Sequence, residues 1–281
     1  MKHATIRIPT ALREFARINA PESLFGPSTP FGLGAKTQHT WNVKSISLQI
    51  AEKYPTINLE LLGYCADLHD IGRRPQYDAL RKEGIGCFND RKIDHHHLGA
   101  QVLDTYLMQH NIGCMKAWRI LRDVIEYHGK KNLWFFADPA SIPYLEIISA
   151  ADDIENGCLG ALGYLECELK IDAKGYKFES PERDQRDLNP ELLSYLERGE
   201  WFDKMKYCTT YADYFIFAAM LAVKSCNHFA TIAKKAMTLP VYETEDGTLL
   251  DAVDGYCHIF RHYLHPQDAE IACRIMLEKC R

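Results

Sequence analysis

Apolar residues that recur at spacings of three and four are the strongest constraint on how this 281-residue chain folds. Between His39 and Tyr54 the apolar positions include Val43, Ile46 and Ile50, a spacing that places them on one face of a helix. Stripes of the same period recur toward the end of the chain. The pattern predicts an all-α protein, with a helical bundle followed by a helical C-terminal extension.

Four more helices are predicted in the first part of the chain. They run from Leu59 to Ile71, from the cap residue Asp94 onward, from Lys116 to His128, and from Ser141 onward. Residues 1–36 are expected to begin irregularly, and the Pro and Gly residues between positions 21 and 34 predict a loop. A second loop is predicted over residues 73–90.

The second part of the chain is predicted to be mostly helical as well. Residues 170–190 are highly charged and indicate a long surface loop, whereas Ala212–Met237 predicts one apolar helix. Residues 239–255 are expected to be irregular, and Pro266 is expected to open a terminal helix. We expect a core with its N-terminal loop segment over residues 1–165, and the helical extension over 166–281 packed on that core.

Charge and cysteine usage narrow the choice of partners. The formal net charge is −5 with scattered basic residues, which argues against a duplex nucleic-acid partner but not against a nucleotide or another phosphate ester. The ten cysteines include no CxxC pair and are read as reduced thiols. The longest apolar run, Phe215–Val223, is too short for a membrane span, so we expect no membrane partner and a cytoplasmic location. A homo-oligomer is left open.

The predicted helices carry a repeated pattern of histidine and aspartate on their apolar faces. These residues are His39, His69 with Asp70, His95, His128 and Asp152. A charged group in such a position is costly unless it is coordinated or paired. Nitrogen and oxygen donors of this kind suit Mn, Mg, Fe, Co, Ni or Zn. We therefore expect one divalent metal to be held by His39, His69, Asp70 and Asp152.

Periodicity also ranks the residues around these ligands. Asp152 shares the apolar stripe of its helix, whereas Asp153 aligns with the more polar side, so Asp152 is the preferred ligand. The catalytic candidates are Asp70, His95 and His128. For the two histidines a second metal, proton transfer and phosphate contact all stay open, and His128 has a further reading as a charge at a helix C-terminus. His96 and His97 are expected to face solvent.

Three basic residues flank the expected metal ligands in the sequence. Lys36, Arg73 and Arg74 are candidates for binding substrate phosphate, and the arginines offer a bidentate fork to its oxygens. Surface ion pairs are the alternative role for all three.

Two segments resemble the HD-domain superfamily of metal-dependent phosphohydrolases. Gln38-His39-Thr40, followed by Val43, is similar to the helix of the first histidine in that superfamily. Leu68-His69-Asp70-Ile71-Gly72 is similar to its signature step, and the likeness extends over roughly residues 35–160. The resemblance implies a helical core with a His, His-Asp, Asp metal site.

A narrower resemblance is to the deoxynucleoside triphosphate triphosphohydrolases, the dGTPase-like proteins. Residues 149–154, Ser-Ala-Ala-Asp-Asp-Ile, are similar to the segment that carries the last metal ligand there, and residues 13–17 and 24–39 resemble that family's N-terminal part. After His-Asp-Ile-Gly that family continues with His-Pro-Pro-Phe-Gly-His. This chain has Arg73 to Asp78 instead, so Asp78 stands where the family has its catalytic histidine, and it is read as a helix cap.

A third segment resembles other HD phosphohydrolases. Residues 95–103 are similar to their HxxxGAxxL segment, which implies a role for His95 in binding a second metal or the phosphate. Together these likenesses imply a phosphohydrolase acting on nucleotides, with a dNTP converted to deoxynucleoside and tripolyphosphate as the favoured reaction. The alternatives are a phosphodiesterase or nucleotidase with a two-metal site, and a nucleotide-sensing HD protein with little turnover.

Overall fold

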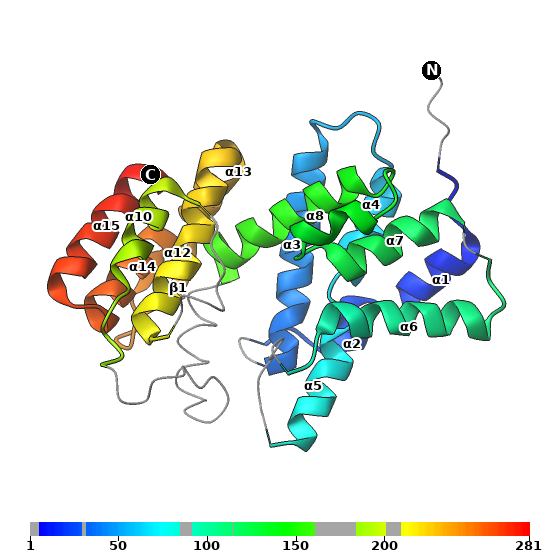
Figure 1. Ribbon diagram of the computed structural model, residues 1–281, viewed down its shortest axis with the longest axis horizontal. Helices are drawn as coiled ribbons and strands as arrows, with labels where there is room; N and C mark the ends of the chain where they lie inside the picture. Colours follow the sequence, from blue (N-terminus) through cyan, green and yellow to red (C-terminus); the bar gives the residue numbers. More distant parts are fainter. Residues whose placement is uncertain (1–5, 30–31, 85–91, 114, 161–183, 201–208) are drawn as a thin grey trace. The chain divides into compact units, whose positions relative to one another are not determined.

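A computed structural model describes residues 6–29, 32–84, 92–113, 115–160, 184–200 and 209–281 (Figure 1). The chain divides into two compact units, Met1–Asp152 and Asp153–Arg281, and each is described by itself. The predicted boundary at residues 165/166 and most of the predicted loop over 170–190 lie outside the described residues. The expected domain division therefore stays a prediction. Helices dominate both units, which confirms the predicted all-α fold.

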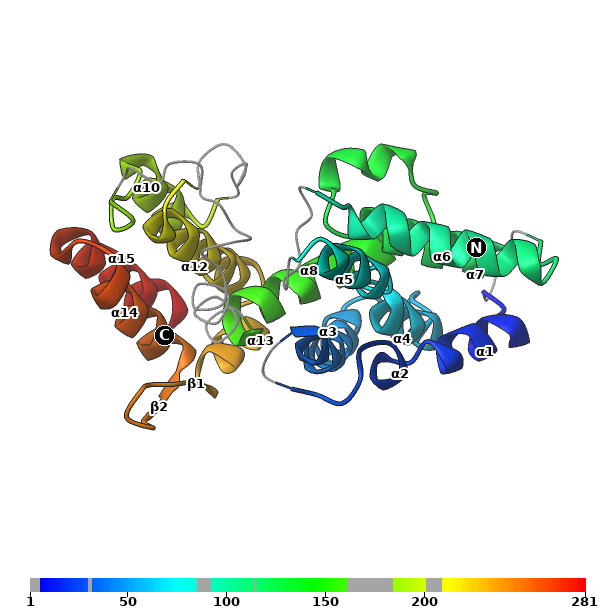
Figure 2. The same ribbon diagram turned by 90° about the horizontal axis from the view of Figure 1, so that it is seen from below.

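The first unit contains the helices that the apolar stripes predict. They are α3 (Ala35–Ala51), α4 (Leu59–Leu68), α6 (His95–Gln109), α7 (Lys116–Tyr127) and α8 (Ile142–Ile154), the last of which ends just beyond the unit. The α4 helix lies between α3 and α7, and α6 packs against α7 (Figures 1 and 2). Asn58 and Asp94 cap α4 and α6 as predicted, because their side chains accept backbone N–H bonds of Leu61 and His96.

The N-terminal segment is more helical than predicted. Helices α1 (Thr10–Ile18) and α2 (Pro21–Phe25) occupy part of the stretch that we expected to be irregular. The physical reason is a short apolar stripe, since Leu12, Phe15 and Ala16 are buried at helical spacing. The Phe15 ring lies 4.7 Å from the ring of Tyr106 and so attaches α1 to α6.

The predicted loop after the His-Asp step is also wrong over its first ten residues. Helix α5 (Arg73–Lys82) begins directly there, and α4 ends at Leu68 instead of Ile71. Pro75 is compatible with the first turn of α5, and Gln76 and Leu80 are buried one helical turn apart. The Gln76 amide donates to the carbonyl oxygen of Ile93 at 2.6 Å and thereby ties α5 to the segment before α6.

Two glycines allow the turn after α4 to approach α6 at backbone distance. A Cβ atom on Gly72 would overlap the carbonyl oxygen of His95 and would lie 2.5 Å from the backbone nitrogen of Gly99. A Cβ atom on Gly99 would in turn lie 2.7 Å from the Ile125 side chain. No side chain larger than hydrogen fits at Gly72, so this glycine lets the backbone next to Asp70 approach the backbone of His95 closely.

The second unit is built around α12 (Tyr211–His228). This helix packs against α10 (Pro190–Arg198), α14 (Ala252–Tyr263) and α15 (Pro266–Cys280), and the last confirms the predicted terminal helix. The predicted single helix over Ala212–Met237 is wrong, because Phe229 leaves the helical region with φ −130° and ψ 45°. Helix α13 (Ala230–Met237) follows that break.

The prediction that residues 239–255 are irregular is wrong. Strands β1 (Pro240–Glu243) and β2 (Leu249–Asp251) form an antiparallel hairpin, and α14 begins at Ala252. The turn signal was Asp246-Gly247, since Gly247 adopts φ +81°, which glycine tolerates best. Among the described residues no helix is both long and apolar enough to cross a membrane.

Replacing Gly72 by alanine should strongly destabilise the first unit, because the new methyl group has no room against the backbone of α6. We expect a loss of about 3 kcal/mol in the free energy of unfolding, measured by urea denaturation. Gly113 is the matched control, since a Cβ atom there would meet nothing within 4 Å. Equal stability of the Gly72→Ala and Gly113→Ala variants would contradict the close approach.

Candidate metal centre

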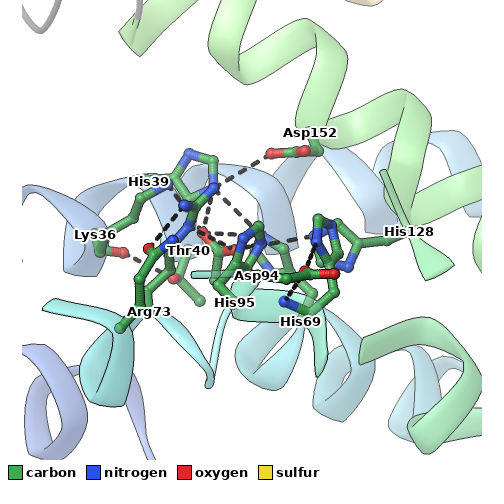
Figure 3. Close-up of polar contacts among 12 residues, drawn as sticks. Lys36, His39, Thr40, His69, Arg73, Asp94, His95, His128 and Asp152 are labelled. Carbon is green, nitrogen blue, oxygen red and sulfur yellow. Dashed lines mark hydrogen bonds and ion pairs between the residues drawn. The ribbon is translucent and has the colours of Figure 1, made fainter. Parts of the chain in front are cut away.

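The first unit brings the sequence-predicted ligands to one place (Figure 3). His39 lies on α3, His69 and Asp70 follow α4, His95 opens α6, His128 ends α7, and Asp152 lies near the end of α8. All but Asp152 are buried, and Asp152 retains limited exposure. Elements far apart in the sequence thus converge on a small cluster of imidazoles and carboxylates.

His39, His69 and Asp152 form the first group of potential ligands. The Nε2 atoms of His39 and His69 are 3.3 Å apart, and Asp152 Oδ1 lies 3.3 Å from His39 Nε2. One ligand atom from each residue lies within 4.8 Å of the other two. Asp153 is placed differently, because its carboxylate pairs with Lys224 at 2.6 Å. The geometry is therefore that expected for Asp152 as the inward carboxylate.

His95 and His128 belong to a second group, on the other side of Asp70. Asp70 Oδ1 lies 3.1 Å from His95 Nε2 and 3.9 Å from His128 Nε2. Its other oxygen, Oδ2, lies 3.5 Å from His39 Nε2 and 3.8 Å from His69 Nε2. The two oxygens of a single buried carboxylate therefore face two different sets of histidines.

Backbone carbonyl groups orient two of these imidazoles. His69 Nδ1 donates to the carbonyl oxygen of Ala66 at 2.7 Å, and His128 Nδ1 donates to that of Val124 at 2.9 Å. A carbonyl oxygen can only accept, so each Nδ1 carries the proton and each neutral ring keeps a lone pair on Nε2. Burial lowers the pKa of both histidines and thus favours the neutral form, which binds metal.

Asp70 is kept ionised by two cationic side chains. Burial by itself raises the pKa of this carboxyl, but the charges of Lys36 and Arg73 hold the pKa well below its usual range. Lys36 Nζ lies 2.9 Å from Asp70 Oδ2, and Arg73 Nε lies 3.4 Å from Oδ1. The centre therefore combines a fixed negative charge with neutral nitrogen donors.

Only two of the three predicted phosphate-binding residues lie beside Asp70. Lys36 and Arg73 lie beside Asp70 with side chains only 13% and 15% exposed. Arg74 is 47% exposed, pairs with Asp78 at 2.8 Å and donates to the carbonyl oxygen of Leu24. The structure thus brings two of the three basic residues to the centre, and gives Arg74 the surface ion pair that was its alternative role.

The expectation that His96 faces solvent is wrong, whereas His97 is exposed as expected. The His96 side chain is 12% exposed, and its ring stacks near those of His95 and His128. Burial lowers the pKa of His96 to about 4. The sequence signal was Asp94 two residues earlier, because a capping carboxylate can also reach the imidazole at that spacing. Helical periodicity alone gave no such indication.

Comparison with known proteins finds a family model that matches this part of the chain. Residues 37–157 match the family model of the HD domain. The match includes all the His and Asp residues described above and supports placement in the HD-domain superfamily of metal-dependent phosphohydrolases. No curated protein and no solved structure matches the chain.

The donor set fits a divalent cation. Neutral imidazole nitrogens with fixed orientation and ionised carboxylate oxygens are the ligands that Mn, Fe, Co, Ni or Zn take, and carboxylate-rich positions also suit Mg. The residues that would hold the cation in the first group are His39, His69, Asp70 and Asp152. In the second group they are Asp70, His95 and His128.

The buried histidines predict that the metal-free protein loses stability in acid. The unfolded chain binds protons to its histidines below about pH 6.5, whereas in the folded chain His96 stays neutral down to about pH 4. The free energy of unfolding therefore decreases as the pH is lowered from about 6.5 to about 4. After chelator treatment we expect a melting temperature lower by about 5 °C at pH 5 than at pH 7.5.

The matched variants for this pH effect are His128→Gln and His97→Gln. The first removes a buried proton acceptor and should reduce the pH dependence, whereas the second removes an exposed one and should not. A melting temperature that is the same at both pH values in the metal-free wild type would contradict the prediction.

Proposed function

We propose that the chain is a metal-dependent phosphohydrolase that acts on nucleotides through a centre for two divalent cations. The observation that carries this proposal is the position of Asp70, with Oδ2 toward His39 and His69 and Oδ1 toward His95 and His128. A carboxylate placed in this way can bridge two cations. The HD-domain match supports the chemistry, since HD domains are generally phosphohydrolases.

Each part of the centre has a defined task in this proposal. Divalent cations supply Lewis acidity and lower the pKa of bound water, which makes attack on phosphorus possible at neutral pH. Lys36 and Arg73 attract and orient phosphate oxygens, because their positive charges lie within 3.5 Å of Asp70 at the centre. The backbone carbonyl groups of Ala66 and Val124 hold two imidazoles in the metal-binding tautomer.

The favoured substrate is a deoxynucleoside triphosphate, converted to deoxynucleoside and tripolyphosphate. This assignment rests on the similarity of residues 24–39 and 149–154 to the dNTP triphosphohydrolases. The second candidate is a phosphodiesterase or nucleotidase, and the position of Asp78 favours it. Asp78 replaces the histidine typical of the triphosphohydrolases, and its half-exposed carboxylate pairs with Arg74.

The experiment that separates these reactions is product analysis. The purified protein is incubated with each dNTP, with nucleoside monophosphates and with a nucleotide diester, in Mn²⁺ or Mg²⁺, and the products are resolved by chromatography. Deoxynucleoside with tripolyphosphate supports the first candidate, and phosphate or a monophosphate supports the second. Binding of nucleotide without turnover would instead support a sensing role and would overturn the hydrolase proposal.

The Asp152→Asn variant should lose hydrolysis by at least about 100-fold, because it removes a charged ligand of the first group. Asp153→Asn is the matched control, since Asp153 pairs with Lys224, and it should keep activity within a factor of about three. Initial rates at saturating metal provide the measurement. Similar rates in the two variants would show that Asp152 is not a ligand.

The Arg73→Ala variant should raise KM for the substrate by about 10-fold, because a charge-assisted phosphate contact contributes about 1.5–3 kcal/mol at most and some of that is screened. Arg74→Ala should change KM by less than twofold, since Arg74 forms a half-exposed surface ion pair with Asp78 and is not among the residues around Asp70. Arg73→Lys tests whether charge alone suffices. Equal effects at positions 73 and 74 would exclude a specific phosphate role for Arg73.

A further inference from the structure

His96 lies beside the second group of ligands, where sequence analysis did not place it. Its ring centroid is 3.8 Å from that of His95 and 4.5 Å from that of His128. One ring nitrogen from each of the three residues lies within 4.8 Å of the other two. Three imidazoles gathered in this way present the kind of nitrogen donor set that a transition-metal cation takes.

The orientation of the His96 ring is set by a carboxylate. Asp94 Oδ1 lies 3.1 Å from His96 Nδ1 and also accepts the backbone N–H of His96 at 3.0 Å. The other oxygen of Asp94 pairs with Lys130 Nζ, which anchors the carboxylate from the opposite side. A carboxylate accepts, so the proton of His96 lies on Nδ1 and the lone pair lies on Nε2.

The same arrangement occurs at two histidines of the centre. His69 and His128 also donate from Nδ1 to an acceptor outside the centre, which leaves the lone pair of each ring on Nε2. Metal-binding histidines typically show this outer hydrogen bond, which fixes the tautomer and raises ligand basicity. At His96 the acceptor of this outer hydrogen bond is the charged carboxylate of Asp94, which polarises the ring more than a carbonyl group does.

A glycine provides the space for the ring. A Cβ atom on Gly129 would lie 2.9 Å from His96 Nε2, which is closer than side chains normally approach. The imidazole therefore occupies room that a side chain at position 129 would need. Gly129 follows His128 directly, so the same turn that delivers His128 also admits His96.

We propose that His96 is a third imidazole ligand of the second cation and that Asp94 is its positioning residue. The proposal rests on the two-cation centre of the proposed function. It adds His96 as a ligand of the second cation and Asp94 as the carboxylate that orients His96. The second cation then has Asp70, His95, His96 and His128 as ligands. Asp94 and Lys130 link this half of the centre to the protein surface, since both are partly exposed.

The test is a count of metal ions in the full-length protein. The metal-free protein is reconstituted with Mn²⁺ or Co²⁺, the ions per chain are determined by elemental analysis, and each affinity is measured by competition with a chelating dye. We expect two ions in the wild type. In His96→Ala the affinity for one ion should stay unchanged, and the affinity for the other should fall by at least about 10-fold. The visible absorption bands of the second Co²⁺ ion should shift.

His97→Ala is the matched control, because His97 is an exposed neighbour whose ring contacts Gln101. It should bind both ions like the wild type. Asp94→Asn tests the positioning residue separately, since asparagine caps helices as well as aspartate but lacks the charge. We expect the affinity of this variant for the second ion to be about 10-fold lower, with an unchanged circular dichroism spectrum.

The outcomes separate this proposal from the one on which it rests. If His95→Ala and His128→Ala lose the second ion but His96→Ala binds two ions with wild-type affinity, His96 is not a ligand and the two-cation centre stands. If the wild type binds only one ion and His95→Ala does not change it, both proposals fail. Should His96→Ala not fold, wild-type affinity for the second ion in Asp94→Asn overturns the proposed role of the pair.

Discussion

The ionised carboxylate of Asp70 is the constraint on which the rest of the first unit depends. A buried charge is strongly unfavourable unless it is compensated, and this one is compensated by Lys36 and Arg73 and surrounded by imidazoles. These groups come from α3, from the start of α5 and from the ends of other helices. The helices must therefore meet with their polar ends at one point, while their apolar faces form the core around it.

This requirement explains which features the sequence could predict. A helical stripe that contains His39 or Asp152 indicates the inward direction of that side chain, because the period of the helix determines its face. Asp152 and Asp153 differ by one position and so by about 100° on the helix. That difference was enough to select Asp152, and the structure places Asp153 against Lys224.

Other features depended on contacts that helical periodicity does not encode. Helix α5 has only a short apolar stripe, and a tertiary hydrogen bond from Gln76 to the carbonyl oxygen of Ile93 fixes its position. His96 turns inward because Asp94 holds its ring and Gly129 leaves room, and neither effect follows from a helical stripe. Arg73 and Arg74 are equivalent in sequence terms, yet only Arg73 lies beside Asp70.

The close backbone approach at Gly72 and Gly99 has a consequence for how the centre meets a cation. Main-chain atoms fix how closely the turn after α4 approaches α6, so the backbones of Asp70 and His95 are held at a nearly constant separation. The conformational entropy of gathering them is lost when the chain folds, and little more is lost when a cation enters. A cation that suits this backbone separation would therefore bind without a further rearrangement of the main chain.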